Sequence, residues 1–270
     1  NGLRTEMTVT NATVVLNNLN WAAMIGESSL LVDGPDAELE VLGLAYFGRN
    51  ASTTQPGTNV FTVSGGATMR VNTHSLSTTD VKIGPYTASP QTSVMTITGP
   101  GSLYDYSLSS RGMGVYDGGG FVVSNGATAH LRPSLSVSGV AGNPGGFIRV
   151  VGEGSTLKFG YPGSVSTPTI SVSGGEDSRF ELDGGLVRSY YSNRRLTCEL
   201  GQLAGSFGTL RISGGTLDMG GSADGETNGY IRVGMAGSGF LDVSGGEIVG
   251  CSSIDIAERG GETGPTTNRY

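Results

Sequence analysis

The stretch Val63-Ser64-Gly65-Gly66-Ala67-Thr68-Met69 joins an apolar β-former, a hydroxyl residue and a glycine pair to the start of a second apolar segment. The same arrangement recurs along the chain. Clear copies begin at Ile97, Val123, Val172, Ile212 and Val243, and looser copies begin at Val9, Val32 and Val150. The nine starts span 234 residues, from 9 to 243, in eight intervals of about 29 residues each. Self-similarity at such a period predicts a solenoid or an array of small repeated units.

Each repeat contains about three short β-strands separated by glycine-containing corners. Leu241 and Val243 share one face of a strand, and Asp242 lies on the other. A second motif, apolar-x-apolar followed by Gly or Ala, lies between successive starts, as in Val81-Lys82-Ile83-Gly84. Glycine suits the corners because it accepts a positive φ without steric cost. No apolar pattern of helical period extends over about ten residues, so the chain is predicted to be all-β.

Stacking of the repeats explains how such short strands form a core. One coil of three strands cannot bury its apolar face alone, but each strand can pair with its equivalent in the next coil. We therefore predict one domain over residues 1–270, a parallel β-helix (β-solenoid) of about nine to ten coils. Right-handed winding is expected because parallel crossovers almost always have this hand. A β-propeller is the main rival, but intervals of 22–27 residues are too short for blades of four strands.

Composition limits the partners and the compartment. The net charge of −7 and the pI near 4.8 disfavour nucleic acid and an anionic membrane surface as partners. No stretch approaches the roughly 20 apolar residues of a membrane-spanning helix, so no membrane insertion is predicted. The chain opens Asn1-Gly2-Leu3-Arg4 without an initiator Met or a signal peptide, which indicates a mature product or a piece of a larger protein.

The two cysteines are predicted to be unpaired. Aligning the phrases places Cys198 and Cys251 about two coils apart. At roughly 4.8 Å per coil, their separation along the stack is ~9.6 Å. A disulfide needs Cα atoms within about 7 Å of each other. We therefore expect two free, mostly buried thiols.

The glycine-pair phrases also carry a family resemblance. Val63–Val71 and Val243–Val249, in which a Gly-Gly corner is followed by alternating apolar residues, resemble the passenger β-helices of bacterial autotransporters and related repeat-built surface proteins. The resemblance implies an extracellular, adhesive or filamentous part. It carries over no catalytic residue.

Many β-helices degrade polysaccharides, so an enzymatic or metal site is a possible function for this fold. Such sites need several carboxylates on one face with Arg, Lys or His nearby. His74 and His130 are each isolated, and no paired aspartates accompany them, so we predict a non-enzymatic protein without a cofactor. In the acidic stretch 174–184, Asp177, Glu181 and Asp183 are the candidate calcium ligands. The calcium-binding nonapeptide is not repeated there, and a solvated outer face is the preferred interpretation.

The most unusual segment lies in the 40-residue interval between Val172 and Ile212. Loops on a regular scaffold often carry recognition, and Tyr with Arg is typical of interface hot spots and of sugar-stacking surfaces. A loop that only packs its aromatic side chains on the flank is an equally weighted alternative. The candidate contacts with a partner or glycan are Arg188, Tyr190, Tyr191, Arg194 and Arg195.

The functional prediction is a structural or adhesive β-solenoid outside the cell or at a bacterial surface. A terminal coil leaves backbone groups unpaired, and no capping helix is evident at either end. Two explanations stay open: self-association through the terminal coils, as in a filament, or continuation of a longer β-helix. The polar segment 257–270 is expected to be irregular or to dock. The alternative function is a carbohydrate-binding or polysaccharide-degrading β-helix, similar to tailspikes and lyases.

Overall fold

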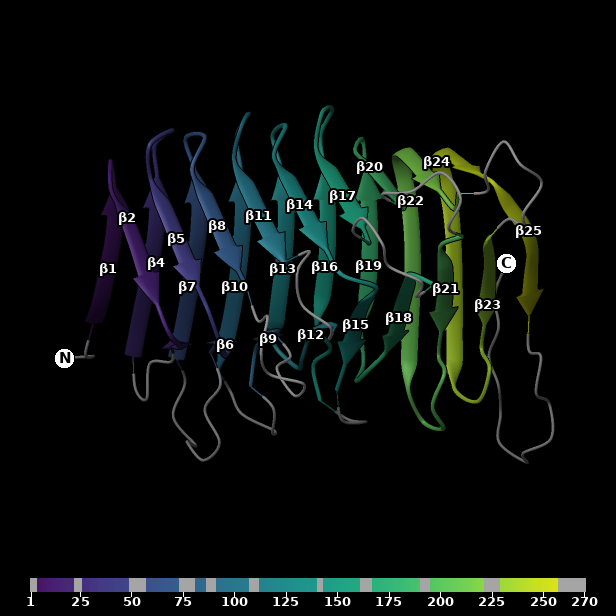
Figure 1. Ribbon diagram of the computed structural model, residues 1–270. Helices are drawn as coiled ribbons and strands as arrows, with labels where there is room; N and C mark the ends of the chain where they lie inside the picture. Colours follow the sequence, from purple (N-terminus) through teal and green to yellow (C-terminus); the bar gives the residue numbers. More distant parts are fainter. Residues whose placement is uncertain are drawn as a thin grey trace.

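The computed structural model describes residues 4–21, 26–48, 57–72, 81–85, 91–106, 112–139, 143–160, 167–189, 195–220 and 229–256. Within them, 25 β-strands and no helix form, which confirms the all-β prediction. The strands build nine stacked coils, from β1 (Arg4–Thr10) at one end to β25 (Cys251–Ile256) at the other (Figure 1). In this part of the chain no helix is long and apolar enough to cross a membrane.

Every coil runs through a first, a second and a third strand. In coils 8 and 9 one long strand, β22 (Phe207–Asp218) or β24 (Ser238–Val249), supplies both the first and the second. The other first strands are β1, β4 (Gly26–Asp33), β7 (Gly57–Ser64), β10 (Thr92–Thr98), β13 (Gly119–Ser124), β16 (Phe147–Val151) and β19 (Arg179–Asp183). The other second strands are β2 (Thr13–Leu16), β5 (Glu38–Val41), β8 (Thr68–Val71), β11 (Leu103–Tyr106), β14 (Thr128–Leu131), β17 (Thr156–Phe159) and β20 (Leu186–Ser189). The third strands are β3 (Leu19–Trp21), β6 (Ala45–Phe47), β9 (Val81–Ile83), β12 (Met113–Val115), β15 (Ser134–Ser138), β18 (Thr169–Ser173), β21 (Thr197–Leu200), β23 (Gly229–Val233) and β25.

Each strand pairs in parallel with its equivalent in the next coil. The first and second strands form one 16-stranded sheet, because β22 and β24 continue through the corner between them, and the third strands form a 9-stranded sheet. The predicted parallel β-solenoid is thus confirmed, with nine coils in the described residues. Right-handed winding stays a prediction, and residues 257–270 lie outside the described part.

The repeat phrases mark the first strands, with one exception. The register stacks one inward residue of each first strand in a single column: Val9, Val32, Val63, Ile97, Val123, Val150, Leu182, Ile212 and Val243. The prediction that Val172 starts a repeat is wrong, because Val172 lies in β18 and stacks on Val137 and Leu200. The Ser-Gly-Gly sequence that follows first strands also follows this third strand, at Ser173-Gly174-Gly175. The shared sequence explains the wrong assignment. Leu182 to Ile212 is 30 residues, so the 40-residue interval disappears.

In coils 2 to 6 the corners between first and second strands are hydrogen-bonded turns. In coil 3 the Ala67 N–H donates to Ser64 O at 3.0 Å, and the two central residues, Gly65 and Gly66, have φ of 64° and 88°. Positive φ at both positions is the type I′ geometry, which favours Gly or Asn. In the next coil the Ser102 hydroxyl accepts the Gly66 N–H at 3.1 Å. The Ser/Gly corners are therefore accounted for by the fold itself.

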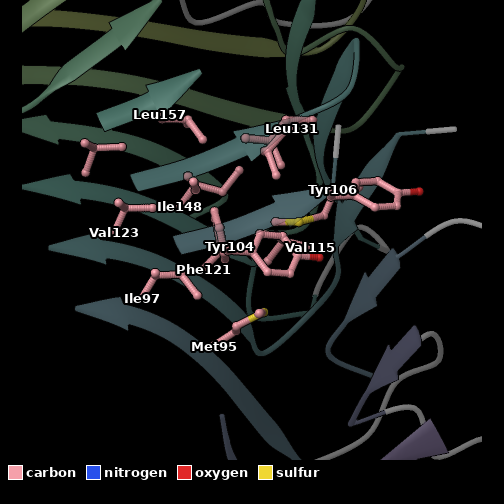
Figure 2. Packing of buried hydrophobic residues seen from close by; sticks show 14 of the residues in the cluster. Met95, Ile97, Tyr104, Tyr106, Val115, Phe121, Val123, Leu131, Ile148 and Leu157 are labelled. Carbon is pink, nitrogen blue, oxygen red and sulfur yellow. The ribbon is translucent and has the colours of Figure 1, made fainter. Parts of the chain in front are cut away.

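The inward side chains form one continuous core along the stack. Phe61, Phe121 and Phe180, from coils 3, 5 and 7, share a column in the first strands and are each no more than 1% exposed. In Figure 2 the Tyr104 and Phe121 rings lie together inside the coil, and their centroids are 5.9 Å apart in an edge-to-face arrangement. Edge-to-face pairs add to the stability gained from burial alone. Tyr104 stacks on the small Ala129 in its own column, which leaves room for the ring.

Replacing Tyr104 by Phe is expected to raise the free energy of unfolding by about 1 kcal/mol. The Tyr104 hydroxyl is buried without a hydrogen-bond partner among the described residues. Burial raises the pKa of this phenol well above its usual value, so it stays neutral. Removing an unsatisfied buried hydroxyl removes a desolvation cost and keeps the ring contacts. Urea denaturation of the two proteins measures the difference.

Tyr106→Phe is the matched control and is expected to act in the opposite direction. Tyr106 is also fully buried, but its hydroxyl donates to the Gly112 carbonyl at 3.3 Å. Losing this bond leaves the carbonyl short of a donor and costs about 0.5–1.5 kcal/mol. A loss of stability in both variants would contradict the account of Tyr104.

Three polar side chains are stacked inside the core of coils 2 to 4. Ser28, Asn59 and Ser93 occupy one inward column of the first strands and are 3%, 0% and 0% exposed. The Ser28 hydroxyl donates to Asn59 Oδ1 at 2.7 Å, and Asn59 Nδ2 donates to the Ser93 hydroxyl at 3.1 Å. The bonds run along the stack, so this polar ladder ties three coils together.

The prediction that both cysteines are unpaired is confirmed, and the prediction that both are mostly buried holds for Cys198 alone. Cys198 lies in coil 7 and Cys251 in coil 9, and neither forms a disulfide. Cys198 is buried in an inward column between Ile170 and Ile231, and desolvation raises the pKa of its thiol. Cys251 is only partly buried.

Candidate functional site

Two of the five predicted contact residues lie in the described part of the chain. Arg188 belongs to β20, the second strand of coil 7, and Arg195 lies just before β21, the third strand of the same coil. Both therefore flank one corner of the solenoid. Tyr190, Tyr191 and Arg194 lie outside the described residues.

Arg188 belongs to a column of outward side chains on the second strands. In register, this second-strand outward column consists of Val15, Glu40, Arg70, Asp105, His130, Lys158, Arg188, Asp218 and Val249. His130, Lys158 and Arg188 are consecutive members, so three basic side chains lie about 4.8 Å apart along the stack. Lys158 makes no ion pair among the described residues. The three residues form a basic strip on an acidic protein.

His130 is held in place by its neighbours within this strip. Its Nε2 lies 2.5 Å from the Gly160 carbonyl, and its Nδ1 lies 4.0 Å from the Asp105 carboxylate. This fits the interpretation of an outward strand histidine with structural contacts. The other histidine, His74, lies outside the described residues.

Arg195 packs against the flank of the solenoid. Its guanidinium lies 5.7 Å from the centre of the Tyr230 ring, and the guanidinium of Arg232 lies 4.5 Å from the same ring. Arg232 also reaches Glu199 at 3.7 Å. Both cations gain from the ring quadrupole. For Arg195 the contact favours the alternative in which the loop packs on the flank.

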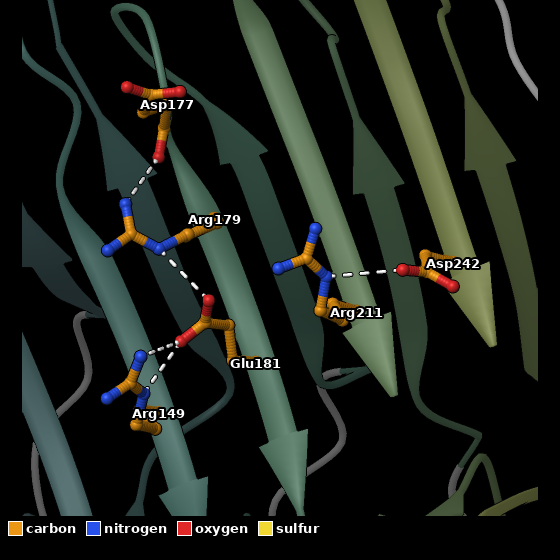
Figure 3. A network of polar contacts seen from close by, with 6 residues as sticks. All are labelled: Arg149, Asp177, Arg179, Glu181, Arg211 and Asp242. Atoms are coloured by element: carbon orange, nitrogen blue, oxygen red, sulfur yellow. Dashed lines mark hydrogen bonds and ion pairs between the residues drawn. The ribbon is translucent and has the colours of Figure 1, made fainter. Parts of the chain in front are cut away.

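The acidic stretch forms an ion-pair ladder (Figure 3). Glu181 accepts hydrogen bonds from the Nε of Arg149 at 2.7 Å and the Nε of Arg179 at 3.1 Å. On the following coils Arg211 donates to Asp242 at 3.2 Å. Arg149, Glu181, Arg211 and Asp242 stack in one outward column, so charge alternates from coil 6 to coil 9.

This ladder bears on the candidate calcium ligands. The Glu181 carboxylate is already engaged by two guanidinium groups, and the backbone carbonyl of Asp177 accepts from Arg179 at 3.1 Å. No group of three or more His, Cys, Asp or Glu side chains that could hold a metal ion occurs among the described residues. The acidic stretch is thus organised around arginine.

Glu181→Gln is expected to lower the free energy of unfolding by about 1 kcal/mol at low salt. The Glu181 side chain is 13% exposed, and losing its charge leaves Arg149 and Arg179 facing each other without a counter-ion. The loss should shrink in about 1 M NaCl, where the Debye length is about 3 Å. Urea denaturation at the two salt concentrations measures it. Glu153→Gln, in an exposed turn without an ion pair in the described structure, is the control and should change little.

The two ends of the solenoid differ in how well their inward residues are covered. In coil 9, Val243, Ile254 and Ile256 are 48%, 46% and 38% exposed. Their partners in coil 8, in the same columns, are buried: Ile212, Ile231 and Val233. In coil 1, by contrast, Val9 and Leu19 are 3% and 4% exposed. Among the described residues, coil 9 presents an uncovered section through the core.

Sequence reasoning missed the basic strip and the ion-pair ladder. Each member of the ladder directly precedes a residue of the inward column, as Arg149 precedes Val150 and Glu181 precedes Leu182. Aligning the repeats on the inward column Val150, Leu182, Ile212 and Val243 would have stacked the preceding charged residues, Arg149, Glu181, Arg211 and Asp242, one above the other. Comparison with protein-family models, with curated proteins and with solved structures finds no match to this chain.

Proposed function

We propose that this chain is a non-enzymatic structural β-solenoid that associates end to end and presents its long flanks to other molecules. The observation that carries the proposal is the uncovered core of coil 9. Val243 is 48% exposed, whereas Ile212 directly beneath it is fully buried. Exposed apolar residues clustered on one surface are typical of an interaction site.

The backbone of the terminal coils supports the same proposal. The outer edges of β24 and β25 carry N–H and C=O groups that pair with no further strand in the described residues. Such an edge is a template for another strand. A contact between two different ends is heterologous and can repeat without closing, which produces a filament.

A concentration series tests end-to-end association. Negative-stain electron microscopy and sedimentation velocity of the full chain should show species that lengthen with concentration at constant width. Val243→Asp should abolish them, because a carboxylate tolerated at the open end would be buried in the joint. Val122→Asp is the matched control, since Val122 is an outward valine in the middle of the stack. Only single-length rods at every concentration would contradict the proposal.

The proposal includes a location outside the cell or at a bacterial surface. This location rests on the likeness of the repeat to autotransporter passengers. Detection of the native protein in the secreted or surface fraction of its source cells would test it.

Carbohydrate binding is the second candidate, and the basic strip favours it. His130, Lys158 and Arg188 lie in line on one flank and suit a ligand with regularly spaced negative charges, such as an acidic polysaccharide.

The double variant Lys158→Ala with Arg188→Ala tests carbohydrate binding and should abolish retention on polygalacturonate. The control is Lys82→Ala, which should not affect retention, because Lys82 lies on the third-strand face between Tyr46 and Tyr116. Tyr191→Ala tests the loop in the same assay. Polysaccharide degradation would need paired carboxylates, and the acidic residue Glu181 is held by arginines.

A further inference from the structure

We propose that two copies of this chain pair side by side through the outward face of the first strands in coils 6 to 9, with their solenoid axes antiparallel. The surface consists of the ion-pair ladder and the outward column beside it on the same strands (Figure 3). This inference goes beyond the proposed end-to-end association, because it uses a flank of the solenoid. The flank is the same whatever precedes or follows the nine coils.

The order of charges along the ladder carries the first argument. Arg149, Glu181, Arg211 and Asp242 follow one another in one outward column, one residue per coil, so the charges are plus, minus, plus, minus. In the opposite direction the order is minus, plus, minus, plus, which is its complement. A two-fold axis that runs along the strands, between coils 7 and 8, therefore places Arg149 opposite Asp242 and Glu181 opposite Arg211. By symmetry each of these contacts occurs twice.

The neighbouring outward column suits the same arrangement. Two residues before the ladder, Phe147, Arg179, Thr209 and Phe240 stack in register from coil 6 to coil 9. The two-fold axis places Phe147 of one copy opposite Phe240 of the other, and Arg179 opposite Thr209. Contacts between aromatic rings add to the stability of an interface, and no like charges meet in either column.

The ladder keeps polar groups available after its internal ion pairs have formed. Arg149 donates to Glu181 and Arg211 donates to Asp242, yet these two arginine side chains remain 45% and 50% exposed. A guanidinium carries five N–H donors, and a carboxylate has about four acceptor positions. The Asp242 side chain is 32% exposed and Glu181 is 13% exposed. The two contacts between Arg149 and Asp242 are therefore expected to contribute most.

The alternation of charge also disfavours other arrangements of the same two faces. With parallel solenoid axes each residue would face its own equivalent, so Arg149 would lie on Arg149. In an antiparallel pair shifted by one coil, Glu181 would lie on Glu181 and Arg149 on Arg211. Both arrangements bring like charges together, which costs free energy. The ladder thus specifies orientation and register more than it supplies affinity.

The pair is expected to be weak and dependent on concentration. Four coils at roughly 4.8 Å each span about 19 Å along the stack, so the contact belongs to the small, transient class of interfaces. Exposed ion pairs contribute little individually. We therefore expect an equilibrium between single solenoids and pairs that shifts towards pairs at high protein concentration and towards single solenoids at high salt.

Two half-ladder reversals test the pairing. Arg149→Glu with Glu181→Arg gives the order minus, plus, plus, minus, and Arg211→Glu with Asp242→Arg gives plus, minus, minus, plus. Each double variant faces like charges in a pair with itself and should pair about a hundredfold more weakly than the native chain. An equimolar mixture should restore pairing, because each position of one variant then faces the opposite charge of the other. Thr62→Glu, in the same outward column in coil 3, is the matched control and should pair normally.

Sedimentation velocity of the full chains at low salt measures the pairing, and circular dichroism should show both double variants folded. Restoration in the mixture is the decisive result, since each variant still lacks its native internal ion pairs there. Pairing that persists in both variants alone, or a mixture that does not pair, would overturn the inference.

Negative-stain electron microscopy separates this contact from end-to-end association. Side-by-side pairing doubles the width of a rod, whereas end-to-end association lengthens it. Rods of the native chain that lengthen but never widen would overturn the inference and leave the proposed function standing. Rods that widen without lengthening would support the inference and contradict end-to-end association.

Discussion

Phe121→Ala is expected to lower the free energy of unfolding by about 3–5 kcal/mol. Phe121 is fully buried, stacks between Met95 and Ile148 in its column, and meets the Tyr104 ring edge to face. Truncation removes the ring from two coil interfaces at once and leaves a cavity that the parallel strands, fixed by their hydrogen bonds, can close only in part. Urea denaturation followed by circular dichroism measures the loss.

Phe207→Ala is the control for the same chemical change. Phe207 begins β22 and is 42% exposed, so its truncation should cost less than about 1 kcal/mol. A similar loss in both variants would mean that the stacked core is not what limits stability. In a repeat structure, stability is close to a sum of neighbouring interfaces. A side chain such as Phe121, in a coil with coils on both sides, contributes to two interfaces and should therefore matter more than one in a terminal coil.

The strand pattern could be predicted from the sequence because it is local. Alternation along 179–183 predicts Phe180 and Leu182 as inward residues and Glu181 as outward, and the burial of this strand confirms it. The corner chemistry is local as well, since a positive φ selects Gly or Asn wherever a tight turn is needed.

The assignment of phrases to corners could not be made from local chemistry alone. Val172-Ser173-Gly174-Gly175 has the favoured composition but ends a third strand, whereas the true first corner of coil 7 is Leu182-Asp183-Gly184-Gly185. Asp replaces the hydroxyl residue there, as it does in Val32-Asp33-Gly34. Only the pairing with neighbouring coils distinguishes the two corners.

The candidate site was missed in part for the same reason. Composition identified Arg188 within a loop rich in Tyr and Arg, but its neighbours in space are about 30 residues away in sequence. Lys158 and His130 join it only through the register of three strands.

The buried polar ladder was also unpredicted, and it supports a second large effect. Asn59→Ala is expected to lower the free energy of unfolding by about 2–4 kcal/mol. Asn59 is fully buried, and its loss leaves the hydroxyls of Ser28 and Ser93 in the core without the hydrogen bonds that it makes to them. Urea denaturation gives the loss. Asn72→Ala is the control, because Asn72 is only partly buried and its Nδ2 lies 3.5 Å from Glu40.

A triple variant separates hydrogen bonding from packing at this ladder. Ser28→Ala, Asn59→Leu and Ser93→Ala together replace every polar member by an apolar side chain of similar or smaller size. If unpaired hydroxyls cause the loss in Asn59→Ala, the triple variant should recover to within about 1 kcal/mol of the native protein, because no buried polar group is left unsatisfied. An equal loss in both variants would assign the effect to packing. The site is tightly packed, because a Cβ added at Gly48 would lie 1.7 Å from the Ser93 hydroxyl. Recovery would mean that the ladder adds little net stability and that its contribution is the register of coils 2 to 4, since a polar column pairs only with itself.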